Sequence, residues 1–537
     1  MNRPSAAAGP SVIVDPNASV RAREARVGLP ARAMTAATAT ADQLGTIETN
    51  IPARLDRLPW SRWHWRILIG LGTVWILDGL EVTIVGSIAG AISAKGSGIN
   101  IAAADVAGMA ASMYVAGACF GALLFGQLTD RFGRKRLFMI TLGVYLAATI
   151  ATAFAFAPWF FFACRFVTGM GIGGEYSAIN SAIDELIPAR HRGRIDIIIN
   201  GTYWAGAAAG ALLSVAALHI FSPFLNWRVC FGLGFILGLA ILIVRRHVPE
   251  SPRWLFIHGR DREAEEVTRQ IEREVAESTD ETLEEPDETI TIRQRKTISL
   301  VEIARTVVKT YPKRTVLGLA LFIGQAFLYN SILFGYATLL SKFFHVATAN
   351  APYYLVAFAV GNLLGPLILG GLFDSVGRKP MIAGTYILSG LLLLGTGYLF
   401  QQHQLTAGTL TLCWSVVFFF ASAGVSAAYL TVSEIFPMET RALCIALFYA
   451  VGTGIGGIIG PQLFAPLIAT GKASEVFKAL AIGAGLMIIG GIAEIVFGVK
   501  AERQRLEGIA KPLTAVEDAR QGSTTPSVSP SSRPATG

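Results

Sequence analysis

The stretch GQLTDRFGRK at residues 126–135 decides the fold, because GGLFDSVGRK at residues 370–379 repeats its pattern. Both read Gly-x-x-x-Asp-x-x-Gly-Arg-Lys, and both follow a long apolar segment. A second pair, ELIPARHR at 185–192 and EIFPMETR at 434–441, shares the pattern Glu-x-x-Pro-x-x-x-Arg. Because two independent motifs recur in the same order at nearly one offset, the chain is predicted to consist of two repeated halves.

Outward from these motifs, apolar segments dominate the 537 residues. The chain is 53% hydrophobic and 15% charged, whereas soluble domains carry about 25% charged residues. About 20 consecutive apolar residues suffice to cross a bilayer as a helix. Twelve such segments occur, six on each side of the charged stretch 246–313. The predicted spans are 66–92, 104–128, 137–157, 159–187, 197–219, 227–245, 314–340, 350–373, 381–400, 407–432, 442–469 and 475–499.

These patterns predict an all-α membrane protein with twelve transmembrane helices in two six-helix pseudo-repeats. The stretch 246–313 has the composition of a linker with surface helices, and the two ends of the chain are polar enough to be disordered. The predicted organisation is a disordered cytoplasmic tail (1–65), an N-terminal six-helix half (66–245), a cytoplasmic linker (246–313), a C-terminal six-helix half (314–499) and a second disordered cytoplasmic tail (500–537).

Loop charge predicts the orientation of the helices. Basic residues gather in the loops at one end of the predicted bundle: Arg131, Arg134, Lys135, Arg136, Arg190, Arg192, Arg194, Arg378, Lys379 and Arg441. The loops at the other end hold only Lys95, Lys342 and Lys472. Because cytoplasmic loops are enriched in Lys and Arg, the basic end and both termini are expected in the cytoplasm. We therefore expect a multi-pass protein of the inner (plasma) membrane, and the net charge of +8 reflects orientation rather than nucleic-acid binding.

The sequence lacks the residue patterns of several other classes of protein. No two of the five cysteines have metal-ligand spacing, and the seven histidines are scattered, so no metal site is expected. The sequence has no Ser/His/Asp or His/Glu cluster of the kind that an enzyme would need. It also has no GxxxxGK[ST] loop, so neither a cofactor nor ATP as the energy source is expected. The expected partners are a small-molecule substrate, protons and the lipid bilayer, with the chain acting as a monomer.

Two carboxylates, Asp78 and Glu81, lie inside the first predicted span, in WILDGLEVTIVGS. A carboxylate in the hydrocarbon costs at least about 2.5 kcal/mol, so such residues are usually functional. Three residues apart, the two share one helix face, and their repulsion favours one proton being held between them. The alternative is a structural ion pair or a packing hydrogen bond. We expect a proton-coupling site.

Two further charged residues, Arg165 and Glu175, lie inside the fourth predicted span. By the helical rise, Arg165 lies close enough in depth to Glu81 for its long side chain to form a pair. Protonation of Glu81 would then free Arg165, either to change the packing or to bind a substrate carboxylate. Arg165 could instead reach the outer headgroups. Glu175 is expected either to carry a second proton or to contact substrate, or else to form a packing hydrogen bond.

Polar residues of the seventh predicted span suggest a substrate site. Gln325, Tyr329 and Tyr336 fall on one helical stripe and Asn330 is adjacent. Amides and phenols bind without charge, which suits a site that must also release its ligand. Weaker candidates on other spans are Asn200, Tyr203, Trp204 and Trp414. An aromatic stripe can also be plain packing.

The motif DRFGRK, the stretch RFVTGMGIGGEY followed by ELIPARHRGR, and PESPRWL at 249–255 resemble the major facilitator superfamily over about residues 60–500. The likeness is strongest to its sugar-porter-like and metabolite–proton symporter branches. It implies that helices one, four, seven and ten line the path, and Glu81 matches the coupling carboxylate of proton-linked sugar porters. Sugar porters usually carry two glutamines on helix seven, whereas Gln325 is followed by Ala326 here.

The repeated motifs are expected to form a cytoplasmic gate, in which charge pairs lock the two halves in the outward-facing state. The alternative is simple anchoring, which explains the basic residues but not the acidic ones. The predicted gate consists of Asp130, Arg131, Gly133, Arg134, Glu185 and Arg192 in the first half, and of Asp374, Gly377, Arg378, Glu434 and Arg441 in the second.

The sequence therefore predicts a secondary active transporter that moves a small polar metabolite, preferably an organic acid, together with protons by alternating access. Alternatives are a sugar–proton symporter, a drug/proton antiporter, an uncoupled facilitator and a receptor that does not transport.

The orientation can be tested by labelling single cysteines in a cysteine-free variant. Arg260→Cys should stay unlabelled by an impermeant reagent in intact cells, whereas His403→Cys should be labelled, because the two positions lie at opposite ends. Labelling at position 260 would contradict the predicted topology.

Overall fold

The computed structural model describes residues 43–102, 105–245, 249–279, 289–295, 300–436 and 441–501. The helices of the first half are α4 (Arg62–Ile92), η1 (Val106–Ala110) with α6 (Ala111–Phe132), α7 (Arg134–Ala153), α8 (Pro158–Leu186), α9 (Ala189–Gly201) with α10 (Tyr203–Ile220), and α11 (Asn226–Arg245). Those of the second are α15 (Pro312–Phe344), α16 (Ala351–Ser375), α17 (Arg378–Gln401), α18 (Ala407–Ile435), α19 (Arg441–Phe448) with η3 (Tyr449–Thr453) and α20 (Gly454–Ala469), and α21 (Ala473–Phe497).

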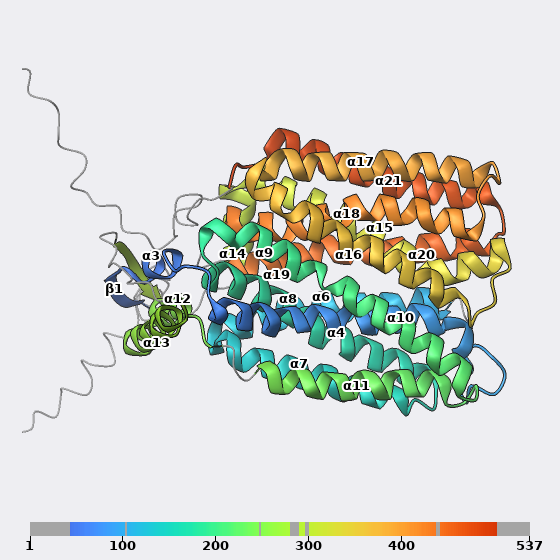
Figure 1. The fold of residues 1–537 in the computed structure, drawn as a ribbon, viewed down its shortest axis with the longest axis horizontal. Coiled ribbons are helices and arrows are strands. Elements are labelled where there is room, and N and C mark those ends of the chain that lie inside the picture. The colour runs from blue at the N-terminus through green and yellow to red at the C-terminus, as the bar shows by residue number, and fades with distance from the viewer. Residues whose placement is uncertain are drawn as a thin grey trace, which may run out of the picture.

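The predicted twelve helices in two halves are confirmed. Each predicted span coincides with one of these helices or with a continuous pair, and the two halves lie side by side with their helices roughly parallel to one long axis (Figure 1). Within the described residues, ten helices are long and apolar enough to cross a membrane. The helices α8, which carries Arg165 and Glu175, and α11, whose apolar part is shorter, complete the set of twelve.

Close helix contacts depend on glycines at four-residue spacing. On α8, a Cβ at Gly169 or Gly173 would lie 2.0 or 1.9 Å from a backbone oxygen of α6. On α6, a Cβ at Gly117 or Gly121 would lie 1.9 or 2.0 Å from a backbone oxygen of α8. Small residues let helix backbones approach in lipid, where apolar side chains gain little by leaving the solvent. The pairing fixes α6 against α8 and so sets the positions of the polar side chains between them.

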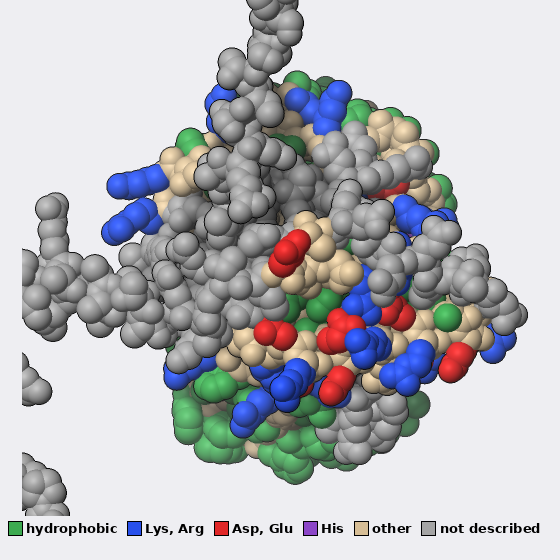
Figure 2. Space-filling view, turned by 90° about the vertical axis from the view of Figure 1, so that its left-hand side faces the viewer, with side chains coloured by type: hydrophobic (Ala, Val, Ile, Leu, Met, Phe, Trp, Pro, Cys, Tyr) green, Lys and Arg blue, Asp and Glu red, His purple; other side chains and the backbone are tan. Residues whose placement is uncertain are grey.

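A compact group of short elements covers the end of the bundle that carries the repeated motifs, which we call the basic end (Figure 1). It contains the strand β1 (Gln43–Thr49) paired antiparallel with β2 (Ile290–Arg295), and the helices α3 (Ile51–Asp56), α12 (Pro252–Ile257) and α13 (Asp261–Thr279). Acidic and basic side chains are intermingled on this face (Figure 2). The linker continues through α14 (Leu300–Thr310) into α15.

The first part of the chain is more ordered than its composition indicated. Residues 43–56, within the predicted disordered tail, form β1 and α3. In the linker, the predicted surface helices are present as α12 and α13, which are separated where Gly259 adopts φ +73°. The strand was missed because six or seven residues of mixed polarity give a weak pattern, and because its partner lies in the linker, far along the chain. Residues 1–42 and 502–537 of the two predicted tails lie outside the described residues.

Charge pairs fasten this segment to the linker; we call the set Arg54, Arg57, Glu265 and Glu272 the N-terminal clasp. Arg54 lies 2.7 Å from Glu265 and 2.6 Å from Glu272, and Arg57 lies 2.6 Å from Glu272. Burial alone would raise the pKa of Glu272, but the hydrogen bonds and charges of the two arginines outweigh it and lower that pKa.

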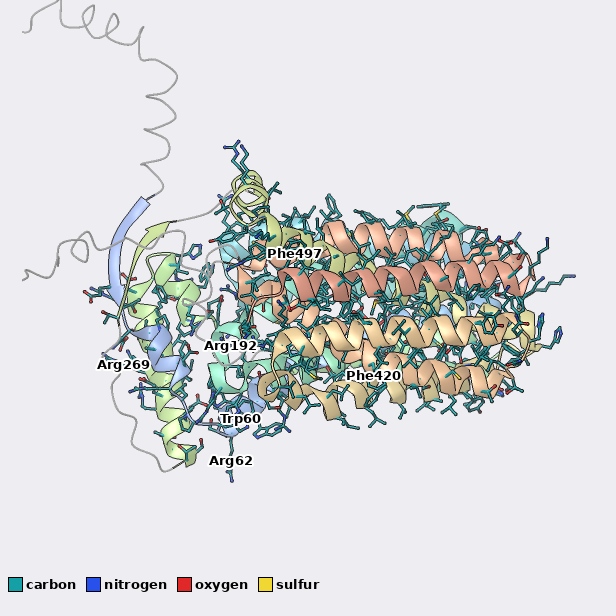
Figure 3. The ribbon with its side chains drawn as sticks, turned by 90° about the horizontal axis from the view of Figure 1, so that it is seen from above. Trp60, Arg62, Arg192, Arg269, Phe420 and Phe497 are labelled. Atoms are coloured by element: carbon teal, nitrogen blue, oxygen red, sulfur yellow. The ribbon has the colours of Figure 1, made fainter. Side chains whose placement is uncertain are left out.

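Asp56 makes a second connection, to Arg192 of α9 at 3.0 Å and to Arg253 of α12 at 3.2 Å. Figure 3 shows Arg192 at the junction between this group and the helix bundle. The N-terminal segment is therefore held both to the linker and to the second repeated motif of the first half.

The clasp should weaken in acid. Because its folded pKa is depressed, Glu272 contributes stability above its unfolded pKa and loses it as pH falls through the folded pKa. Glu272→Gln should cost about 1.5–3 kcal/mol of local stability, the range for a charged hydrogen bond. Hydrogen exchange of residues 43–58 at neutral pH should then rise by roughly tenfold or more.

The matched control is Glu277→Gln, at an exposed position of the same helix. The control should exchange like the original protein. Lowering the pH should reduce the protection of these residues, relative to the intrinsic exchange rate at each pH, more in the original protein than in the Glu272 variant. Equal exchange in the two variants would show that the clasp does not hold the segment.

Candidate functional site

A cavity of ≈ 120 Å³ lies between the two halves. The first half contributes polar and aromatic side chains from α4, α6, α8, α9 and α10, among them Trp75, Asp78, Tyr114, Tyr176, Asn200 and Trp204. The second half contributes others from α15, α18 and η3, among them Gln325, Tyr329, Asn330, Ser422, Tyr429 and Tyr449. We call this space the central cavity.

Asp78 is the one carboxylate among the lining residues that the structure describes, and none of these is Lys, Arg or His. The side chain is 1% exposed, and the hydroxyls of Tyr114 and Tyr176 donate hydrogen bonds to its two oxygens. Tyr114 comes from α6 and Tyr176 from α8, the two helices that the glycine spacing holds together. The carboxylate therefore ties three helices of the first half to one point.

Aromatic rings from both halves meet at this cavity. Trp75 stacks on Tyr176 with ring centroids 4.6 Å apart and an interplanar angle of 12°. Tyr449 of the second half meets Tyr176 edge-on at 4.7 Å, and Tyr429 meets Trp75 at 5.7 Å. Flat faces and edges of this kind give a planar apolar ligand both stacking and edge contacts.

A second aromatic contact bridges the halves, since the ring centroids of Trp204 of α10 and Tyr329 of α15 lie 5.5 Å apart. The indole and the phenol both line the central cavity. Tyr329 also donates a hydrogen bond of 3.2 Å to Asn362 of α16, which fixes its ring.

The predicted pair of Glu81 and Arg165 is present, and both side chains are fully buried. Arg165 also donates to Thr152 at 2.8 Å and to Thr168 at 3.1 Å, and its guanidinium lies 4.7 Å from the ring centroid of Phe231. These partners compensate the cost of burying the charge. Neither Glu81 nor Arg165 lines the central cavity, so direct binding of a substrate carboxylate by Arg165 is not supported.

Three other candidates lie away from the cavity. Glu175 is buried and accepts a hydrogen bond of 3.3 Å from Thr141 of α7. Tyr336 forms a hydrogen bond with Thr411 and lies 5.2 Å from Trp414, so these two rings pack against each other. Tyr336 shares the stripe of Tyr329 but lies seven residues, or about 10 Å, further along the helix axis.

The remaining candidates Gln325, Tyr329, Asn330, Asn200, Tyr203 and Trp204 line the cavity, as does Asp78. Sequence reasoning missed the aromatic residues Trp75, Tyr114, Tyr429 and Tyr449. A ring inside an apolar span has no signature that separates a ligand contact from packing. The one usable signal was that these four aromatic residues lie close to polar residues on the same helix or on a facing helix.

The repeated motifs form charge pairs at the basic end, one in each half. Arg134 lies 2.5 Å from Glu185, and Arg378 contacts Glu434. The glycines before these arginines, Gly133 and Gly377, have φ of +92° and +116°, values that favour glycine and explain its recurrence.

One contact of the motifs joins the two halves. Asp374 of α16 accepts a hydrogen bond of 2.8 Å from the backbone N–H of Arg194 in α9, and Arg378 lies 3.4 Å from the same carboxylate. A Cβ at Gly193 would lie 2.2 Å from Asp374 Oδ1, so the halves touch closely here. The basic end is therefore closed at this point.

The other predicted gate residues differ in their surroundings. Arg192 pairs with Asp56 rather than with a carboxylate of the second half. Arg131 is exposed, with its guanidinium 5.3 Å from the ring centroid of Phe132. The side chains of Asp130 and Arg441 lie outside the described part of the chain.

Comparison with known proteins agrees with this architecture. The family model described as sugar (and other) transporter matches residues 77–512. A niacin transporter of Acinetobacter baylyi is 27% identical over 413 residues, which cover 77% of this chain and 89% of that protein. A 4-hydroxybenzoate transporter of Pseudomonas putida is 24% identical, covering 83% and 95%. A putative metabolite transport protein of Escherichia coli is 28% identical, covering 85% and 96%.

Among solved structures, a proton:xylose symporter bound to 6-bromo-6-deoxy-D-glucose superposes with a TM-score of 0.66 at 18% identity, covering 83% of this chain and 98% of that one. A partially occluded inward-open conformation of the xylose transporter from E. coli gives 0.61 at 17% identity, covering 81% and 99%. These likenesses establish the fold.

The chain belongs to the sugar (and other) transporter family, with the fold of the major facilitator superfamily. It is a multi-pass membrane protein whose family and relatives are transporters and not enzymes.

The packing beside Asp78 can be tested at Gly79. A Cβ there would lie 1.8 Å from the backbone oxygen of Tyr203, so Gly79→Ala should push α4 and α10 apart. Overpacking of this kind costs about 1–3 kcal/mol. Thermal unfolding in detergent, followed by tryptophan fluorescence, should shift to lower temperature. Gly72→Ala is the control, because its Cβ would lie 3.6 Å from Thr202; equal shifts would refute the close approach.

Proposed function

We propose that this protein is a proton-coupled symporter of a small planar aromatic acid in the inner membrane, with its basic end in the cytoplasm. The observation that carries the proposal is the central cavity, where aromatic rings surround one carboxylate, Asp78, that holds two tyrosine hydroxyls.

The size of the cavity suits one ring. Its volume is ≈ 120 Å³, of the same order as the roughly 150 Å³ engineered cavity that binds benzene. Trp75 and Tyr176 stack on each other and Tyr449 meets Tyr176 edge-on, and all three rings line the cavity as an aromatic wall for a planar body. The polar side chains Asn200, Gln325 and Asn330 supply donors and acceptors for its substituents.

The charge of Asp78 links substrate to proton. An anion in the central cavity meets the like charge of Asp78 and no cationic side chain among the described lining residues. A proton on Asp78 removes that charge and weakens the hold on the hydroxyls of Tyr114 and Tyr176. Those hydroxyls then donate to the carboxylate of the substrate. The anion and the proton therefore bind together, which is the requirement for symport.

Glu81 and Arg165 are proposed to couple proton binding to a change in the packing of α4 and α8. The pair connects α4 with α8 in a fully buried place. Protonation of Glu81 leaves a hydrogen bond in place of an ion pair, and the two helices can then repack. Glu175 lies in the same half and is a candidate for a further proton.

The charge pairs of the basic end are proposed to act as the gate. The contact of Asp374 with Arg194 holds the halves together there, while the pairs Arg134–Glu185 and Arg378–Glu434 hold each half in shape. Opening to the cytoplasm has to break this hydrogen bond between the halves, so its strength affects the equilibrium between the two facing states.

The relatives support the aromatic acid over a sugar. Two of them are named for niacin and for 4-hydroxybenzoate, which are single-ring aromatic acids. The cavity also lacks a second glutamine on α15, where Ala326 lines it beside Gln325. A sugar–proton symporter and an uncoupled facilitator are the alternatives that the experiment below separates.

A cationic substrate is the second candidate, favoured by the same charge balance. A carboxylate among aromatic rings without a basic side chain attracts cations through charge and through the ring faces. A drug/proton antiporter would exchange such a cation for the proton on Asp78.

Uptake into proteoliposomes tests the proposal. With the interior alkaline, labelled nicotinate or 4-hydroxybenzoate should accumulate above the external concentration, and a protonophore should abolish the accumulation. Xylose and tetraphenylphosphonium serve as the sugar and cation probes. Saturable xylose uptake without transport of either acid would contradict the proposal, and proton-driven movement of the cation alone would favour the antiporter.

Glu81→Gln should remove accumulation driven by a pH gradient and leave exchange of labelled for unlabelled acid. A neutral amide mimics the protonated carboxylate, and exchange needs no net proton movement. Retained exchange also shows that the variant folds, which matters because removing one partner of a buried pair costs about 3–5 kcal/mol. Undiminished accumulation would exclude Glu81 from coupling.

A further inference from the structure

A second cavity of ≈ 500 Å³ lies at the end of the bundle opposite the basic end. The end of α4, the end of α15 and the segment that leads into α16 form its walls. Several of its lining residues, including Ser93, Lys342, His345 and Thr348, are exposed, so the cavity is open to solvent. We call it the outer cavity.

The outer cavity lies directly beyond the central one on the same two helices. Val82 of α4 and Leu333 of α15 line the central cavity, whereas Ser87 and Ala337 line the outer one. Between them the helices touch, since a Cβ at Gly86 would lie 3.1 Å from the backbone oxygen of Leu333. One turn of close packing therefore separates two chambers along one path.

The two chambers have opposite charge. Among the described residues that line the outer cavity, Lys342 and His345 are the only ones with ionisable side chains, and none is Asp or Glu. Hydroxyls of Ser87, Ser93, Thr338, Ser341 and Thr348 surround them. Both basic residues lie in or next to the last turn of α15, where cations also stabilise a helix end, so a purely structural role is the competing explanation.

The order of the two cavities along the path suits an anion that enters from the end opposite the basic end. A basic outer cavity raises the local concentration of anions, and hydroxyls donate to a carboxylate without holding it tightly. The central cavity then accepts the same anion only with a proton. The outer cavity therefore supplies the basic side chains that attract the anion first, which the described lining of the central cavity does not have.

We propose that the outer cavity is an initial binding site for the carboxylate of the substrate, with Lys342 as the main contact and His345 as the second. This proposal rests on the proposed function, since it assumes an anionic aromatic substrate. It adds a site and assigns it the carboxylate group as ligand.

The test compares Lys342→Gln with Lys478→Gln. Lys478 lies at the same end on α21 and pairs with Glu475, and it does not line the outer cavity. Uptake of labelled nicotinate is measured in proteoliposomes over a range of concentrations and at low and high salt. Lys342→Gln should raise KM for nicotinate by roughly three- to tenfold with kcat little changed, and should reduce the rise of KM with salt.

Three comparisons make the result specific. Lys342→Arg should restore KM, because the charge returns. The double change Lys342→Gln with His345→Gln should raise KM further. Exchange of nicotinamide, which has the same ring without the carboxylate, should have the same KM in the original protein and in Lys342→Gln.

The outcomes separate the two proposals. If the original protein transports neither nicotinate nor 4-hydroxybenzoate, the proposed function fails. If it transports them but Lys342→Gln keeps the KM of Lys478→Gln, or if only kcat falls, the outer cavity has no recognition role and the basic residues stabilise the helix end. A rise in KM that is equal for nicotinamide would also overturn the charge-based site.

Discussion

The buried pair of Glu81 and Arg165 is the constraint from which the first half takes its arrangement. A charged side chain inside a membrane bundle is stable only when its charge and its hydrogen-bonding groups have partners. Arg165 is fully buried and finds Glu81, Thr152 and Thr168, so α4 is held against α8 by a bond that depends on ionisation. One turn away, Asp78 ties α4 to α6 and α8 through two phenols. The same helix thus carries two buried carboxylates, and each of them connects it to neighbouring helices of the first half.

The central cavity is closed off toward the two ends of the bundle by different means. At the basic end, polar contacts of the repeated motifs bring Arg194 and Asp374 together across the halves. At the other end, Gly86 lets α4 approach the backbone of Leu333 without any charge. Charge pairs and close packing respond differently to protonation and to ligand, so an event in the central cavity can favour opening at one end over the other. The N-terminal clasp adds a third connection, between the start of the chain and the linker.

The sequence predicted the fold well because hydropathy over twenty residues is a strong signal and lipid leaves few alternatives to a helix. Apart from α9, which begins at Ala189 where the span was predicted from 197, the helix ends agree with the predicted spans within a few residues, and the duplicated motifs predicted the two halves. The pairing of β1 with β2 could not be predicted, since it joins short segments that are far apart in the chain. Such pairings depend on tertiary contacts rather than on local pattern.

The site was predicted in part, according to the chemistry of each residue. Asp78, Asn200 and Gln325 stood out because a polar group inside an apolar span is costly. Trp75 and Tyr449 did not, since rings in such spans also pack. Tyr336 and Trp414 share the chemistry of the site but lie too far along their helices to line the cavity. Helical periodicity predicts which face a residue occupies, but it does not predict the level along the helix axis at which the cavity lies.

The central claim is that substrate and proton enter together. The most direct measurement follows the internal pH of lightly buffered proteoliposomes that contain the protein and a trapped pH-sensitive dye, with no initial gradient and the membrane potential clamped at zero. Addition of external nicotinate or 4-hydroxybenzoate should acidify the interior, and Asp78→Asn should abolish that acidification. Entry of the labelled acid through the protein without any protein-dependent acidification would contradict the account and assign the chain to uncoupled transport.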